Sequence, residues 1–134
     1  MKNSSGTRTL ILDANVWVYG LLGASEGATN IILKCLKGEY KVIVNSYIVA
    51  EVTRALKRIA VRIRRDPSEL ERLFWRILNS DNVIRDFRHP VTEDLIEVVR
   101  KSSEILMISR ILETEPKDVP YLVLAFKHRV PIVT

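Results

Sequence analysis

The sequence alternates short apolar runs with longer amphipathic segments, and this alternation limits the fold more than any other feature. Continuous apolar runs are typical of strands that are buried on both faces of a parallel sheet. The amphipathic segments have the period of helices that cover such a sheet. We therefore predict an α/β domain with three layers, in which a central, mostly parallel sheet lies between two layers of helices.

The apolar pattern places the elements. Strands are predicted over residues 9–12, 41–44, 82–87 and 130–134, and helices over 27–38, 47–65, 68–78, 92–112 and 119–128. Gly38 is expected to close the first of these helices. Asn45 or Ser46 should cap the second, and Ser68 and Glu71 have the spacing of a capping box in the third. No linker or repeat divides the chain, so residues 1–134 are predicted to form a single domain.

Composition indicates the partners and the setting. The chain has 134 residues, a net charge of +5 and one cysteine, Cys35. The basic excess favours a polyanionic partner, above all nucleic acid. The lone cysteine, the lack of a long apolar run and the polar N-terminal segment 1–9 predict a cytoplasmic protein without a membrane partner. Gln is absent and Met and Cys are scarce, which favours a heat-tolerant source.

Asp13 and Asn15 come directly after the first predicted strand. Ligands of parallel sheets bind beyond the carboxyl ends of the strands, so both side chains are candidates for a functional site. A turn is the alternative, because Asp and Asn are common after strands. Apolar residues flank the pair on both sides, and a carboxylate in such surroundings needs a hydrogen bond or a cation.

Glu51 lies within or at the edge of the apolar stripe of the helix predicted over 47–65. The same helix carries a basic row on what we expect to be a separate face, made up of Arg54, Arg58, Arg62 and Arg65. This row is the predicted nucleic-acid contact, although such charge runs are usually solvated faces. We favour a functional role for Glu51 over a simple pair with Arg54, which would contribute only a few tenths of a kcal/mol.

Asp118 has a simple explanation as the cap of the helix that begins at Val119 and Pro120. The start of that helix could also lie close to the strand ends that carry Asp13. Carboxylates that converge on one place repel each other unless they bind a cation, and ligation by oxygen alone selects Mg²⁺ or Mn²⁺. Such an ion generates hydroxide and neutralises phosphate charge during hydrolysis.

Three segments together resemble the PIN domain, the metal-dependent ribonuclease fold of VapC-type toxins. They are "LILDANVWVYGLL", "VNSYIVAEVTRAL" and "EPKDVPYLVLAFKHRVPIVT", in the order the family has them. The resemblance implies that Asp13, Glu51 and Asp118 are the catalytic acids and ligands of Mg²⁺ or Mn²⁺. It also implies that Asn15 and Thr134 support them, that RNA is the substrate, and that a homodimer and an antitoxin are expected partners.

One departure from the family pattern follows Thr134. The family normally continues there with a further aspartate, often in "T-G-D-K-D", and then with a final strand and helix. Residues 1–134 lack that segment. We therefore expect weak or undetectable ribonuclease activity from this chain, and association into a dimer or larger form through an open strand edge.

Two alternatives belong to other classes. A phosphohydrolase of the haloacid dehalogenase type also ends its first strand on an aspartate, but it needs a second aspartate where this chain has Asn15. A non-catalytic RNA-binding or protein-interaction module on a degenerate PIN fold needs only the basic row. The first alternative predicts small phosphoesters as substrates, and the second predicts RNA binding that is independent of metal.

Overall fold

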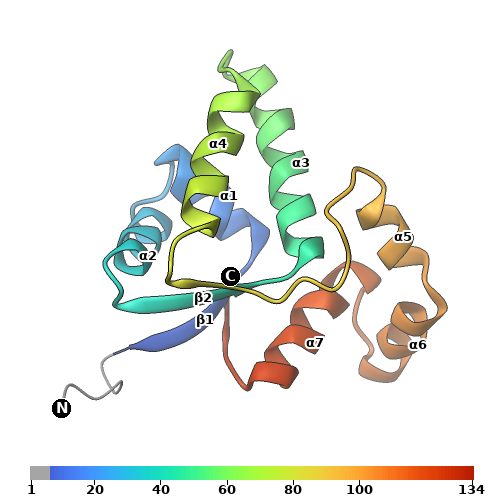
Figure 1. Ribbon diagram of the computed structural model, residues 1–134. Coiled ribbons are helices and arrows are strands. Elements are labelled where there is room, and N and C mark those ends of the chain that lie inside the picture. Colours follow the sequence, from blue (N-terminus) through green and yellow to red (C-terminus); the bar gives the residue numbers. More distant parts are fainter. Residues whose placement is uncertain (1–6) are drawn as a thin grey trace.

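The computed structural model describes residues 7–134, so the prediction about the N-terminal segment 1–9 lies largely outside the described part. The structure contains a sheet of four strands in the order β3-β2-β1-β4, and every pairing is parallel (Figure 1). The strands are β1 (Arg8–Leu12), β2 (Tyr40–Val44), β3 (Val83–Arg85) and β4 (Ile132–Val133). All four lie within or next to the predicted strand segments, and the predicted α/β architecture is confirmed.

Helices cover both sides of the sheet. In Figure 1 the four helices α1 (Ala14–Leu22), α2 (Glu26–Leu36), α3 (Ser46–Arg62) and α4 (Pro67–Leu78) lie above it. The helix α7 (Val119–His128) lies below, and α5 (Leu95–Lys101) and α6 (Ser103–Leu112) lie to the right. Between residues 7 and 134, none of the helices is long and apolar enough to cross a membrane.

The helix ends test the predicted caps. Gly38 has a φ of 83° directly after α2, as expected for a residue that closes a helix. Asn45 caps α3, since its side chain accepts the N–H of Ile48 at 2.9 Å. The capping box of Ser68 and Glu71 is wrong. Asp66 caps α4 instead by accepting the N–H of Ser68 at 3.0 Å, which lets Pro67 occupy the first turn.

Two helical features differ from the predictions. The segment after Asp13 is a full helix, α1, which is buried on much of its surface and so lacks an amphipathic pattern. Its Trp17 is fully buried and packs edge-on against Phe74 of α4, with the ring centroids 5.2 Å apart. The helix predicted over 92–112 is divided into α5 and α6 at Ser102, whose hydroxyl caps α6 by accepting the N–H of Ile105 at 3.2 Å.

Gly20 allows α1 and α2 to approach closely. A Cβ atom at this position would lie 2.4 Å from Cδ1 of Ile32 and 2.9 Å from the backbone oxygen of Ala28. Because the oxygen belongs to the backbone, it cannot move aside as a flexible side chain can. We expect Gly20→Ala to lower the free energy of unfolding by about 1–3 kcal/mol, despite the better helix propensity of alanine. Urea denaturation followed by circular dichroism measures this change.

Gly27 provides the matched control. It lies in α2, is exposed, and has nothing within 4 Å of an added Cβ atom. Gly27→Ala should therefore raise the free energy of unfolding by about 0.5–1 kcal/mol. Equal effects of the two substitutions would contradict the close contact between α1 and α2.

Candidate active site

Asp13 and Thr134 lie next to each other at the carboxyl edge of the sheet. In the register of β1 and β4, Leu12 lies opposite Val133, and the N–H of Asp13 donates to the oxygen of Val133 at 2.9 Å. The chain positions that follow these strands are therefore neighbours. Asn15 is exposed on the first turn of α1, two residues beyond Asp13. The placement of a carboxylate at this edge is as predicted.

Glu51 lies near the start of α3, and its carboxylate accepts hydrogen bonds from three side chains. Nη2 of Arg100 lies 2.8 Å from Oε2, and the Tyr121 hydroxyl donates to Oε1 at 2.5 Å. The Tyr47 hydroxyl lies 3.3 Å from Oε2. Only 17% of the Glu51 side chain is exposed. The simple pair between Glu51 and Arg54 does not form, because Arg54 binds Glu97 at 3.0 Å instead.

Two tyrosine hydroxyls contact the carboxylate of Glu51. Burial raises the pKa of Tyr121 far above its ordinary value, and the nearby negative charges of Glu51 and Asp13 raise it further. Burial likewise raises the pKa of Tyr47 to about 12. The Tyr47 hydroxyl also lies 3.2 Å from the backbone oxygen of Lys117. Both hydroxyls therefore keep their protons at neutral pH. They can donate hydrogen bonds to Glu51 of α3, and the Tyr47 hydroxyl also to the segment before Asp118.

Asp118 occupies the cap position of α7 but does not act as a capping side chain. It ends the 3₁₀ turn Pro116–Asp118, is exposed, and forms no side-chain hydrogen bond to the first turn of α7. Pro120 in that first turn has no N–H to offer, which reduces the need for a cap. Asp118 thus stands at the predicted cap position, but its carboxylate does not cap the helix.

The donor atoms suit a hard divalent cation, but their arrangement is incomplete. Asp13, Glu51 and Asp118 offer only oxygen, which Mg²⁺ and Mn²⁺ prefer. Within residues 7–134, however, no three carboxylate, imidazole or thiol groups lie close enough to hold one ion. The expected convergence of the three acids is thus not reached in this structure. At Glu51 the positive charge is instead supplied by the guanidinium of Arg100.

Sequence reasoning missed several members of the site. Tyr47 precedes Glu51 by four residues on α3, a spacing that puts both on one helix face and could have identified it. Arg100 and Tyr121 reach Glu51 only through the tertiary fold. Asp86 follows β3 as Asp13 follows β1, but it is bound to Lys127 at 2.7 Å and His128 at 2.8 Å. The hydrogen bonds from these two side chains lower the pKa of Asp86.

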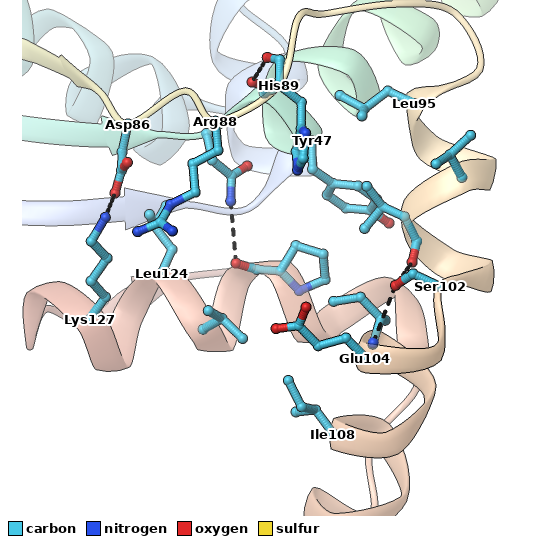
Figure 2. Close-up of a pocket in the computed structure, with 17 residues that line it drawn as sticks. Tyr47, Asp86, Arg88, His89, Leu95, Ser102, Glu104, Ile108, Leu124 and Lys127 are labelled. Carbon is cyan, nitrogen blue, oxygen red and sulfur yellow. Dashed lines mark hydrogen bonds and ion pairs between the residues drawn. The ribbon is translucent and has the colours of Figure 1, made fainter.

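A groove of about 770 Å³ borders the site on the other side of Tyr47. Figure 2 shows Tyr47, Leu95, Ile108 and Leu124 along its walls. Its charged side chains have both signs: Asp86, Arg88, Glu104 and Lys127. Because acids and bases balance, the groove gives no electrostatic reason to place a polyanion there.

The basic row is closer to Glu51 than the sequence suggested. With 3.6 residues per turn, Arg58 and Arg62 lie within about 20° of Glu51 around the axis of α3, at about 10 and 16 Å along it. The expectation of a separate face is wrong, because Glu51 lies in line with Arg58 and Arg62 at the edge of the apolar stripe. Arg58 and Arg62 are exposed, whereas Arg65 comes after the end of α3.

The structure is a parallel α/β domain with carboxylates at its strand ends and a line of exposed arginines on α3. The sequence matches the PIN domain over residues 10–134. The chain therefore belongs to the PIN domain family, whose members are generally nucleases that use divalent metal ions. Comparison with curated proteins gives no match, and neither does comparison with solved structures. Family membership favours the nuclease interpretation over the phosphohydrolase alternative.

Proposed function

We propose that this protein is a metal-dependent endoribonuclease that hydrolyses phosphodiester bonds in RNA. The observation that carries the proposal is the position of Asp13 at the carboxyl end of β1, with the carboxylate of Glu51 bound to the buried Tyr121, whose pKa is also raised by the nearby charge of Asp13. The arginines of α3 extend from this place along one line and give single-stranded RNA a path toward it. The net charge of +5 supports the choice of a polyanionic substrate.

Each residue of the site has a proposed role. Asp13, Glu51 and Asp118 would hold Mg²⁺ or Mn²⁺, which supplies an activated water and neutralises phosphate charge when it is bound. Tyr121 fixes Oε1 of Glu51, and Asn15 and Thr134 orient the carboxylate of Asp13. Arg58 and Arg62 bind phosphates on the RNA that leads into the site.

The cellular role is part of the same proposal. A lone cysteine without an intrachain partner fits a reducing compartment, so we place the protein in the cytoplasm. Exposed apolar side chains on α6 and α7, including Ile111 at 72% and Phe126 at 68% exposure, support association into a homodimer or with a protein partner such as an antitoxin. A role as the toxin of such a pair would account for a small ribonuclease of this kind.

Cleavage of a labelled single-stranded RNA tests the proposal directly. With Mn²⁺ present the protein should cleave the RNA internally, and EDTA should abolish the cleavage. The matched control is Asp81→Asn, which removes an exposed carboxylate outside the site and should retain full cleavage. RNA binding without cleavage in Mn²⁺ would contradict the proposal.

The ion pair on Glu51 favours a second candidate, an RNA-binding module without catalysis on the same fold. A carboxylate that is neutralised by Arg100 can stabilise the fold without any metal. This candidate predicts that RNA binds equally well in Mn²⁺ and in EDTA and is not cleaved. The same assay therefore separates the two functions.

The arginines of α3 provide a prediction about RNA affinity. Replacing Arg58 and Arg62 together with alanine should flatten the slope of log K against log salt concentration by roughly 0.7–1 unit for each lost phosphate contact. Fluorescence anisotropy at several salt concentrations measures the slope. The control is the double replacement of Lys34 and Lys37, which are exposed at the end of α2. Equal slopes for both double variants would show that the basic row is a solvated face that does not bind RNA.

A further inference from the structure

The guanidinium of Arg100 occupies the place on Glu51 where a cation would bind. Its Nη2 lies 2.8 Å from Oε2 of Glu51, and its Nε donates to the Tyr47 hydroxyl at 2.8 Å. The guanidinium carbon also lies 5.8 Å from the centre of the Tyr47 ring. Burial opposes the charge of Arg100, yet the contacts with Tyr47 and Glu51 raise its pKa, so the side chain stays positive.

The contacts of Glu51 occupy both lone pairs of Oε2 and one lone pair of Oε1. One oxygen accepts from Tyr121, and the other accepts from Arg100 beside the Tyr47 hydroxyl. A divalent ion on Oε2 would have to replace the guanidinium, and an ion on the free lone pair of Oε1 would be repelled by the guanidinium that stayed nearby. The absence of a three-ligand cluster among residues 7–134 agrees with this exclusion.

We propose that Arg100 is a positioning residue that competes with the divalent ion for Glu51, so that its withdrawal sets the metal affinity of the site. This inference rests on the proposed function only in assuming that Glu51 is a metal ligand. Arg100 can withdraw without unfolding, because 28% of its side chain is exposed. The helix that carries it stays anchored by Leu95 and Ile96, which are buried in the core.

The same contacts have a second consequence, for the metal-free protein. Without an ion, Arg100 supplies the only basic side chain that contacts Glu51 within residues 7–134, and it helps to hold that carboxylate against Tyr121. Removing Arg100 should therefore weaken the metal-free fold and strengthen metal binding at once. A residue with a merely structural role would weaken the fold to the same extent with and without metal.

Titration calorimetry with Mn²⁺, together with melting curves in EDTA and in Mn²⁺, tests this inference without any RNA. Arg100→Met should bind Mn²⁺ about tenfold more tightly than the wild type. Its melting temperature should fall in EDTA by roughly 5 °C, and Mn²⁺ should recover most of that loss. Arg54→Met is the matched control, because it removes a charge and an ion pair from α3 without touching Glu51. Its Mn²⁺ affinity should equal that of the wild type.

Three results would overturn the inference. Unchanged or weaker Mn²⁺ binding by Arg100→Met would show that Arg100 does not compete with the ion. Equal tightening in Arg54→Met would assign the effect to net charge. Tighter binding that survives in the double variant Glu51→Gln, Arg100→Met would place the ion elsewhere. RNA cleavage is not part of these measurements, so failure of the ribonuclease proposal would leave a positive result here intact.

Discussion

Asp13→Asn is expected to reduce RNA cleavage by roughly a hundredfold to a thousandfold while the protein remains fully folded. Asp13 forms no side-chain ion pair within residues 7–134, and asparagine preserves its shape. Removing its charge also relieves repulsion with Glu51 near the Tyr121 hydroxyl. The free energy of unfolding in EDTA should therefore stay the same or rise slightly. Single-turnover cleavage and urea denaturation measure the two quantities.

The opposite pattern would remove Asp13 from the active site. If the variant cleaves RNA at the wild-type rate but unfolds more easily, Asp13 serves the turn between β1 and α1. The metal response gives an independent check, since Mn²⁺ should raise the melting temperature of the variant less than that of the wild type. Asp81→Asn, which changes the same charge on an exposed turn, should alter neither quantity.

Glu51→Gln should reduce cleavage by a similar factor and, unlike Asp13→Asn, should also destabilise the fold. Glutamine retains an oxygen for the Tyr121 hydroxyl, but it leaves the guanidinium of Arg100 without its counter-charge. We expect the free energy of unfolding to fall by about 1–2 kcal/mol, which is less than for a fully buried pair because both side chains are partly exposed. Urea denaturation at neutral pH measures the loss.

A double-variant cycle isolates the ion pair. The variant Glu51→Gln, Arg100→Met removes both partners, so its loss of stability should be smaller than the sum of the two single losses. Strictly additive losses would show that the two side chains do not interact in solution, and the geometry at Glu51 would then need another explanation.

Local signals were sufficient to predict the strands and several helix ends. The buried strands β1 and β2 are continuous apolar runs, Gly38 adopts a φ that few other residues tolerate, and Asn45 caps the helix that follows it. The same reasoning missed α1, because a helix that is apolar on most sides has no period to detect. It also missed the break at Ser102, where a side chain hydroxyl begins a new helix.

The candidate site was less accessible from the sequence than the fold. Asp13 could be singled out because it directly follows a buried apolar strand, and ligands of parallel sheets bind beyond the strand ends. The partner of Glu51 could not be found, because Arg100 lies 49 residues away and meets it only when α5 packs beside α3. Local reasoning instead offered Arg54, three residues from Glu51, which the structure pairs with Glu97. Short-range pairs on a helix are weak, so a tertiary partner readily replaces them.

The order of the strands has a consequence for folding kinetics. The central strand β1 pairs with β4, so Ile11 of the first strand meets Ile132 near the other end of the chain. Contacts between such distant segments form late, since the loop between them costs entropy before the pairing returns any stability. The neighbourhood of Asp13 and Thr134 is built by this last pairing. If Asp13 and Thr134 belong to the active site as proposed, the site should be completed only when β4 pairs with β1, after β1, β2 and their helices have formed.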